Sequence, residues 1–242
     1  MRILGLDSAT LTAGIAIVDS ERGVLAEGRH DQSNRTADLL VSIDAVCKRA
    51  GIAPMELDAV AIGAGPGSFT GLRIGMATAK GVAFAASKPL WAVSSLAALA
   101  RDGATHLANE QLFPYLDGVV VAVLDARRNE VFAGCYEVSG ATIRALGEER
   151  VFAPRELGAW VTSLAGDRLV SFVGDALAVF PEDLAPFAAG WFATTPSGIA
   201  VAELALAGAR VDVLVTGGPT YIRPSEAEVM YPNGVPGALR KT

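Results

Sequence analysis

One order of secondary structure occurs twice along this chain, and it limits the fold more than any other feature of the sequence. Apolar, β-branched runs predict strands, and apolar residues at helical spacing predict helices. The first half predicts strands at 2–8, 12–19, 23–30, 57–64 and 88–93, and helices from 33 or 34 to 50 and at 71–86. After a helical stretch from 94 and a loop near 109, the second half predicts strands at 118–124, 130–138, 142–151 and 169–174, and helices at 154–165 and 196–207.

The repeat predicts a duplicated fold. Strands that are joined through helices form mixed sheets with helices packed on their faces. We therefore expect two α/β lobes, residues 1–108 and 109–242, with a cleft between them and with the helix 196–208 free to pack back on the first lobe. The alternative is a chance likeness between two unrelated pairs of strands. The duplicated layout is similar to that of the actin, sugar-kinase and heat-shock-ATPase superfamily, in which two aspartates flank the phosphates and metal of a nucleotide. Asp7 and Asp125, each at the end of the first strand of its half, take equivalent places.

Composition argues against several classes of protein. Apolar residues make up 51% of the 242 residues, enough to bury a sizeable core, and the net charge of −6 gives no general basic field for nucleic acid. Cys47, Cys135, His30 and His106 show no spacing typical of a metal site. No apolar run reaches the roughly 18 residues of a membrane span, and no secretory signal pattern opens the chain. We expect a cytoplasmic protein with no bound metal, no tightly bound cofactor and no membrane association.

The segment 63–75 is the most specific stretch, because its glycines follow a predicted strand and precede a predicted helix. Free backbone N–H groups at a helix start can hold an anion. The known nucleotide-binding patterns are absent, since Thr70 occupies the place of a required glycine and no lysine follows Gly71. Ser68 does not stand in the Gly-x-Ser-x-Gly frame of a hydrolase nucleophile. Anion binding is therefore a secondary expectation here.

Four small residues form a ridge on the helix that follows. Gly71, Gly75, Ala79 and Ala83 recur every four residues and so lie along one side of it. Such a ridge lets a second helix approach closely, and we expect that helix to belong to another subunit. The alternative is an internal helix packed on its own sheet. The candidate interface residues are Leu39, Ile43, Gly71, Arg73, Gly75, Thr78, Ala79, Val82 and Ala83.

The two loops that would hold phosphates are degraded. Ala9, two residues after Asp7, stands where the superfamily commonly has glycine, and the segment 125–129 has no glycine. An aspartate that ends a strand can ligate a metal, but it is as often a hydrogen-bonding turn residue. Arg127 and Arg128 at a hairpin tip can bind a phosphate or can simply be solvated. The candidate residues of a degenerate nucleotide or phosphate cleft are Asp7, Thr10, Ser68, Thr70, Asp125 and Arg127.

Four blocks, 3–10, 65–75, 124–132 and 219–223, together resemble the TsaB (YeaZ) family. The resemblance implies the bacterial machinery that installs threonylcarbamoyl on the adenosine beside the anticodon of tRNAs reading codons that start with A. It implies a non-catalytic scaffold or activator that forms a heterodimer with its catalytic paralogue TsaD, or a homodimer when alone. It also implies that the small ATPase TsaE joins, that tRNA is reached through the complex, and that ATP or ADP and Mg are used by the complex as a whole. The catalytic paralogue holds its metal with a His-x-x-x-His pair, whereas the predicted helix 36–50 has no histidine.

Two other functions stay open. A stand-alone small ATPase or kinase would use Asp7 and Asp125 around Mg-ATP, and a glycoprotease-like hydrolase would need a reactive serine or a bound metal. One segment departs from the family pattern. Many relatives carry His-Ser-Glu-Arg-Leu before the first helix, whereas this chain has Gln-Ser-Asn-Arg-Thr-Ala-Asp-Leu at 32–39, so the family's contacts are not carried over there.

Overall fold

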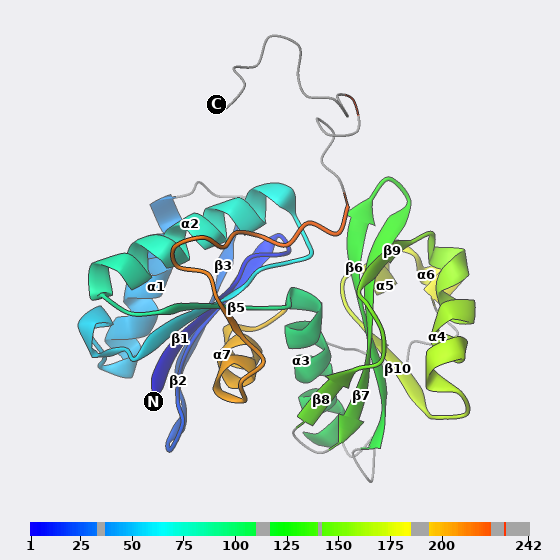
Figure 1. Ribbon diagram of the computed structural model, residues 1–242, viewed down its shortest axis with the longest axis horizontal. Helices are drawn as coiled ribbons and strands as arrows, with labels where there is room; N and C mark the ends of the chain where they lie inside the picture. Colours follow the sequence, from blue (N-terminus) through cyan, green and yellow to red (C-terminus); the bar gives the residue numbers. More distant parts are fainter. Residues whose placement is uncertain (33–36, 110–116, 140–141, 185–193, 224–229, 231–242) are drawn as a thin grey trace.

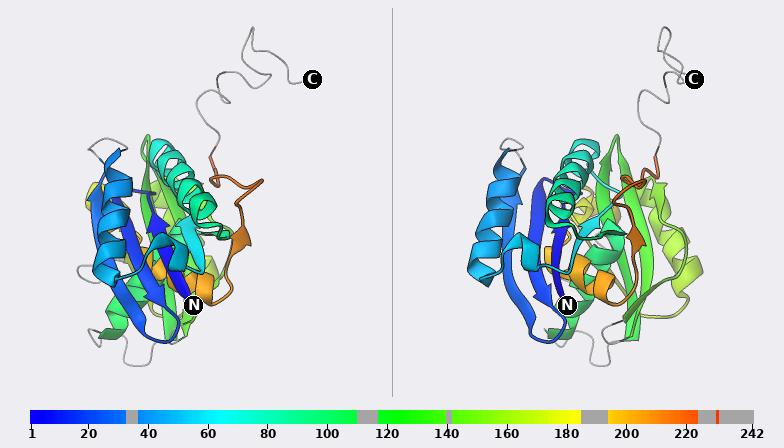
Figure 2. Two further views of the ribbon diagram at one scale, coloured as in Figure 1. Left: turned by 90° about the vertical axis from the view of Figure 1, so that its left-hand side faces the viewer. Right: turned by 60° about the vertical axis from the view of Figure 1, so that its left-hand side comes forward.

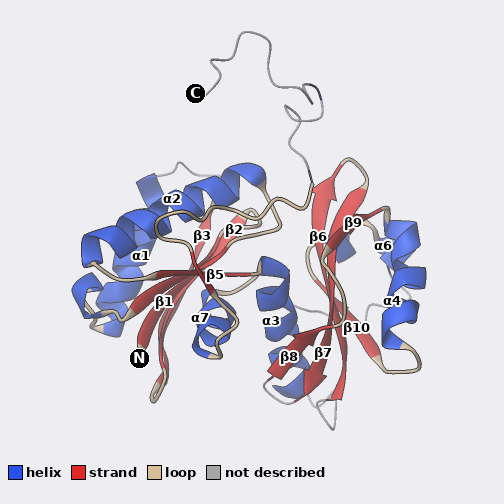
Figure 3. Ribbon diagram, in the orientation of Figure 1, coloured by secondary structure: helices blue, strands red, loops and turns tan. Residues whose placement is uncertain are grey.

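The computed structural model describes residues 1–32, 37–109, 117–139, 142–184, 194–223 and 230. Two sheets with helices around them make up the fold (Figures 1 and 3). The first half contains β1 (Arg2–Asp7), β2 (Thr12–Asp19), β3 (Gly23–Asp31), α1 (Ala37–Ala50), the helical turn η1 (Pro54–Glu56), β4 (Ala59–Gly63), α2 (Phe69–Ala86), β5 (Leu90–Val93) and α3 (Ser95–Asn109). The second half contains β6 (Asp117–Arg127), β7 (Glu130–Ser139), β8 (Thr142–Ala145), β9 (Arg150–Phe152), η2 (Pro154–Glu156), α4 (Leu157–Ala165), β10 (Val170–Val173), α5 (Ala176–Val179), α6 (Pro181–Leu184), α7 (Gly198–Leu206) and β11 (Val211–Asp212). Within these described residues, no helix has both the length and the apolar sequence that crossing a membrane requires.

Both sheets mix antiparallel and parallel strands in the same way. The first has the order β11-β5-β4-β1-β2-β3, and the second has the order β10-β6-β7-β8, with β9 paired to a different stretch of β7. In the first sheet β1 pairs with β2 as an antiparallel hairpin and, along its other edge, with the parallel strand β4. In the second sheet β6 pairs in the same way with β7 and with the parallel strand β10. The expected fold class, two α/β lobes built on one repeated unit, is confirmed. The lobe boundary between residues 108 and 109 stays a prediction.

The structure differs from the sequence-based elements in small ways. The strand expected at 142–151 is two short strands, β8 and β9, which pair with different parts of β7. Between them Glu149 turns inward, where its Oε1 accepts hydrogen bonds from Ser94 Oγ and, at 2.6 Å, from the Tyr136 hydroxyl. The turns η1 and η2 and the elements α5, α6 and β11 have four residues or fewer, too few to show a period. The expected caps of α1, Ser33 and Asn34, lie outside the described residues.

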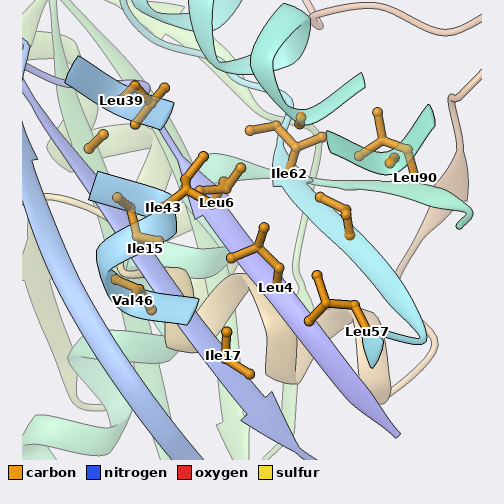
Figure 4. Packing of buried hydrophobic residues seen from close by; sticks show 14 of the residues in the cluster. Leu4, Leu6, Ile15, Ile17, Leu39, Ile43, Val46, Leu57, Ile62 and Leu90 are labelled. Atoms are coloured by element: carbon orange, nitrogen blue, oxygen red, sulfur yellow. The ribbon is translucent and has the colours of Figure 1, made fainter. Parts of the chain in front are cut away.

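The first sheet is apolar on both faces, and helices cover both. On the outer face Leu4 and Leu6 of β1 pack with Leu39 and Ile43 of α1 and with residues of α2 (Figure 4). Successive strand side chains point to opposite faces, so Ile3 packs on the inner face with α7. The helices α1 and α2 therefore lie on the same side of the sheet (Figure 2), with their outer sides turned away from the core.

The helices α3 and α7 fill the space between the two sheets (Figure 1). α7 packs on the first sheet so closely that a Cβ on Gly5 would lie 2.0 Å from the Gly198 carbonyl oxygen. α3 packs on β6 and β7 of the second sheet and also contacts α7. Asp102 of α3 accepts hydrogen bonds from the backbone N–H and the hydroxyl of Ser197, at 2.7 and 2.6 Å, at the start of α7. The two lobes are thus joined through a packed pair of helices.

Candidate functional site

A pocket of about 880 Å³ lies between the two lobes. Its walls come from the turn after β1, the loop before α2, the tip of the β6–β7 hairpin, residues 194–195 before α7 and the C-terminal residues 220–223. Segments far apart in the sequence therefore meet at one cleft. Of the residues predicted for a phosphate cleft, Thr10, Ser68, Asp125 and Arg127 line this pocket. The structure corrects the remainder of that set, because Asp7 and Thr70 do not line it.

Asp7 is sealed beneath the cleft. It is only 1% exposed, and both of its oxygens are engaged, since Oδ1 accepts the Ala9 N–H at 2.8 Å and Oδ2 accepts the Ser95 hydroxyl at 2.7 Å. Burial raises the pKa of Asp7 to about 6, and the two hydrogen bonds offset only part of that rise. Asp7 therefore fixes the turn after β1, which is the turn role that the sequence left open beside metal ligation.

The loop before α2 closes on the same turn. The Ser68 N–H donates to the Ala9 carbonyl oxygen at 2.7 Å, and a Cβ on Gly67 would lie 2.5 Å from the Ala9 Cβ. Glycine is needed here because the two loops touch through their backbones. The Ser68 hydroxyl accepts the Gly71 N–H at 3.3 Å and so caps α2. The protein's own chain thus covers the approach to Asp7.

Asp125 faces the cleft but is held by its own hairpin. Its Oδ1 accepts the Arg127 N–H at 2.8 Å, and its Oδ2 forms an ion pair with Arg127 Nη1 at 2.9 Å. The Asp125 backbone N–H donates to Asp175 Oδ1 at 2.9 Å. Burial raises the pKa of Asp175, and the charge of Asp125 adds to that rise. Across the described ranges, no three His, Cys, Asp or Glu side chains gather as a metal-binding group would. The absence of a bound metal stays a prediction.

Residues 217–223, which we call the C-terminal strap, run from the first lobe toward the second (Figure 1, orange), and residues 220–223 line the cleft. Two hydrogen bonds hold the backbone of the strap to the first lobe. Lys80 Nζ of α2 donates to the Gly217 carbonyl oxygen at 2.7 Å, and the Thr220 N–H donates to the Ala64 carbonyl oxygen at 2.7 Å. A Cβ on Gly65, which has φ +112°, would lie 2.8 Å from the Thr220 carbonyl oxygen. The glycine after β4 therefore makes room for the strap.

The end of the strap links both lobes through side chains. Tyr221 packs against the Phe69 ring with centroids 5.3 Å apart, and its hydroxyl accepts a hydrogen bond from Arg73 Nε at 3.1 Å. Arg223 forms an ion pair at 2.9 Å with Glu130 of β7. The sequence singles out the block 219–223 as part of a family resemblance but does not assign it to the cleft. These contacts join residues far apart along the chain, so no local pattern reveals them.

The small-residue ridge of α2 faces inward. A Cβ on Gly75 would lie 2.0 Å from Ser8 Oγ, and the Ser8 hydroxyl donates to the Gly71 carbonyl oxygen at 3.0 Å. Ala79 and Ala83 are fully buried in the core of the first lobe. The expected contact of this ridge with another subunit is therefore corrected, and the alternative of a helix packed on its own sheet holds. Periodicity identified the ridge, but it does not say which surface the ridge meets.

The outer sides of α1 and α2 carry exposed apolar residues instead. Leu40, Val41 and Phe84 are 53%, 67% and 80% exposed, and we call these three the outer apolar face. Of the predicted interface set, Arg73 is exposed and Thr78 and Val82 are half-buried, while Leu39, Ile43, Gly71, Gly75, Ala79 and Ala83 are buried. Sequence reasoning missed the three exposed residues because Leu40 and Val41 come directly after the core residue Leu39, and Phe84 directly after the core residue Ala83. Apolar residues at the solvent positions of an amphipathic helix were the available signal.

Comparison with known proteins finds relatives along nearly the whole chain. Residues 12–234 match the family described as TsaD, tRNA N6-adenosine threonylcarbamoyltransferase. The tRNA threonylcarbamoyladenosine biosynthesis protein TsaB of Bacillus subtilis is 28% identical over 241 residues, which covers 96% of this chain and 98% of that protein. The protein of the same name from Escherichia coli is 30% identical over 217 residues, covering 80% of this chain and 88% of its own length. The solved structure of YeaZ from Pseudomonas aeruginosa has a TM-score of 0.72 at 26% identity and covers 91% of this chain and 99% of that one.

Proposed function

The chain belongs to the TsaB (YeaZ) branch of the TsaD family, and on that premise we propose that it acts in the biosynthesis of threonylcarbamoyladenosine in tRNA as a non-catalytic partner subunit. Its partner is the catalytic paralogue TsaD, and the ATPase TsaE joins the assembly. ATP or ADP, Mg and tRNA are used by the complex as a whole, and the modified position is the adenosine beside the anticodon. In the absence of the paralogue, the surface of this chain that would contact it supports a homodimer instead.

The observation that carries the partner role is the outer apolar face. Leu40, Val41 and Phe84 expose more than half of their surface on the helices α1 and α2, while the inner sides of these helices are already occupied by the sheet. Exposed large apolar side chains are typical of the centre of a protein interface. The paralogue belongs to the same family, so it offers equivalent helices as the matching surface.

The non-catalytic role is supported by the two aspartates that a kinase or ATPase of this fold would use. Asp7 is buried with both oxygens bonded to Ala9 and Ser95, and both oxygens of Asp125 bond to Arg127. Neither carboxylate is presented to a metal-bound nucleotide in this arrangement. The hydrolase alternative is weakened because Ser68, the serine in the most specific motif, serves as a helix cap.

Binding to the purified paralogue tests the partner role. We expect Phe84→Glu to weaken the complex by about tenfold or more, because a carboxylate would be buried against an apolar partner. The free energy of unfolding of the variant should change little, since Phe84 is 80% exposed. Leu169→Glu is the matched control, because Leu169 is 60% exposed but lies before β10 in the second lobe.

Titration calorimetry gives the dissociation constants of the complex with the paralogue, and sedimentation at several concentrations shows whether the chain alone forms a homodimer. Equal affinity for the wild type and a folded Phe84→Glu protein would show that the outer apolar face is not the interface. A strict monomer at all concentrations would contradict self-association.

A further inference from the structure

The C-terminal strap contacts both lobes within seven residues. Residues 217–221 contact the first lobe through the hydrogen bonds and the ring contact described above. Ile222, which follows, is half-buried and packs against the apolar cluster that includes Phe132 of β7. Arg223 then forms an ion pair at 2.9 Å with Glu130, the first residue of β7. The strap is therefore a short bridge that is attached to a different lobe at each end.

This bridge lies apart from the packed helices that join the lobes. α3 and α7 fill the space between the two sheets, and the strap passes above them from α2 to the β6–β7 hairpin (Figures 1 and 2). A joint of packed helices at one level and a tie at another form a hinge with a latch. A rotation of the second lobe about the α3–α7 pair would change the distance that the strap has to span.

The two attachments of the strap differ in strength. On the first lobe, the Thr220 N–H donates to a backbone oxygen at 2.7 Å, and Lys80 Nζ donates to a strap carbonyl oxygen at 2.7 Å. On the second lobe, the side chains of Arg223 and Glu130 are 29% and 39% exposed, so water and salt reach the ion pair. A solvent-exposed ion pair contributes little to stability, and dissolved ions weaken it further. The attachment to the second lobe is therefore the weaker one.

We propose that the C-terminal strap is a latch between the lobes, closed by the Arg223–Glu130 ion pair and opened when that pair breaks. The strap stays on the first lobe when the latch opens, and the second lobe rotates about the α3–α7 pair so that the cleft widens. The hydrogen bonds between Asp102 and Ser197 are separate from the latch and keep the joint intact. The proposal goes beyond the partner role and does not depend on it, because both members of the latch belong to one chain.

Distances between spin labels on the two lobes test the proposal in the full chain. Ala77→Cys on α2 and Ala159→Cys on α4 place the labels at exposed positions, and the native Cys47 and Cys135 are buried. At low salt we expect one main distance, which corresponds to the closed latch. Salt at about 1 M should add a population with a longer distance, because dissolved ions screen the ion pair.

Substitutions in the doubly labelled chain show whether the ion pair is the latch. At low salt, Arg223→Gln and Glu130→Gln should each raise the ratio of the longer to the shorter distance about two- to fivefold, the range of an exposed ion pair. The double variant should change the ratio no more than Arg223→Gln alone does, because no pair is then left for the second substitution to break. Salt should have no further effect on either single variant.

Arg150→Gln is the matched control, since it breaks the exposed ion pair with Glu148 within the second lobe and does not involve the strap. It should keep the distances of the parent protein at low salt and respond to salt as that protein does. Thermal unfolding shows that each variant is folded. The proposal is overturned if folded Arg223→Gln and Glu130→Gln proteins keep the parent distances at low salt, if the two substitutions act additively, or if high salt leaves the parent protein at one distance.

Discussion

At the scale of single residues, the interior of the first lobe depends on small side chains that meet polar ones. Gly71 and Gly75 of α2 lie against Ser8, and Gly63 of β4 leaves the space that the Asp7 carboxylate occupies. A glycine inside a helix costs roughly 1 kcal/mol relative to alanine. The fit around Ser8 offsets that cost at Gly75, whereas Gly81 on the same helix has no atom near the place of a Cβ.

Gly75 and Gly81 give a matched pair of substitutions on one helix. Gly75→Ala should lower the free energy of unfolding by about 1 to 3 kcal/mol, because the new Cβ would lie 2.0 Å from Ser8 Oγ. Gly81→Ala should raise it by up to about 1 kcal/mol, since nothing lies within 4 Å and alanine favours the helix. Urea unfolding of both variants measures the difference. A Gly75→Ala protein as stable as the wild type would mean that α2 does not sit against Ser8 as described.

Asp102 makes the stability of the folded protein depend on pH. Burial raises the pKa of Asp102 to about 7, and the two hydrogen bonds from Ser197 oppose that rise. The folded protein therefore keeps a proton that the unfolded chain, with a pKa of 3.8, has lost. The resulting stability is fully present below about pH 4 and is lost as the pH rises through about 7.

Asp102→Asn should remove this dependence, because asparagine keeps an acceptor for Ser197 but does not ionise. Between pH 4 and 8 the wild type should lose on the order of 3 kcal/mol more unfolding free energy than the variant. Asp7, with a pKa also raised, to about 6, is present in both proteins, so its own contribution largely cancels, and what remains is the effect of its charge on Asp102. Denaturant unfolding at four or five pH values measures it. A constant difference between the two proteins across that range would contradict the raised pKa of Asp102.

At the scale of elements, the C-terminal strap has no regular hydrogen-bond ladder and depends on side-chain anchors. Tyr221 supplies a ring contact with Phe69 and an acceptor for Arg73. Aromatic pairs contribute about 0.5 to 1.5 kcal/mol beyond their buried area. The strap should therefore open locally more easily than the first sheet.

Replacing this anchor tests how the strap is held. Tyr221→Ala should speed hydrogen exchange of the Thr220 amide, which donates to Ala64, by about tenfold. Tyr221→Phe keeps the ring and loses only the acceptor, so its effect should be smaller. Amides of β1 should be protected equally in all three proteins. Unchanged exchange at Thr220 in Tyr221→Ala would show that the strap is held by its backbone contacts alone.

The elements themselves were largely predictable, because their patterns are local. β-branched runs gave β1, β2, β6 and β7, and helical spacing with Gly51 as a stop gave α1. The partner that each surface of an element packs against could not be predicted from local patterns. The hydrogen bond between Asp7 and Ser95 joins residues 88 apart, and that between Arg73 and Tyr221 joins residues 148 apart. Sequence patterns therefore found the cleft residues Thr10, Ser68, Asp125 and Arg127 but misplaced Asp7 and the Gly71-to-Ala83 ridge.

At the scale of the whole molecule, the two lobes are joined in ways that keep the cleft walls together. Asp102 and Ser197 connect α3 to α7, Arg101 and Glu203 form an ion pair at 3.1 Å beside them, and the strap reaches Glu130 through Arg223. The outer apolar face lies on the side of the first sheet away from α7. The outer apolar face and the cleft are thus separate surfaces, and α2 contributes residues to both.

We propose that this chain supports tRNA modification through a partner and without chemistry of its own. The most direct test of this proposal is reconstitution of threonylcarbamoyladenosine in tRNA from the purified paralogue, the ATPase, ATP, Mg²⁺ and substrates, with the product measured by mass spectrometry of digested tRNA. We predict that the product forms only when this chain is added, that folded Asp7→Asn supports the wild-type rate, and that Phe84→Glu does not support it. Product formation at the same rate without the chain would show that the chain is dispensable, and its loss in an Asp7→Asn protein that still binds the paralogue would show that Asp7 takes part in the reaction.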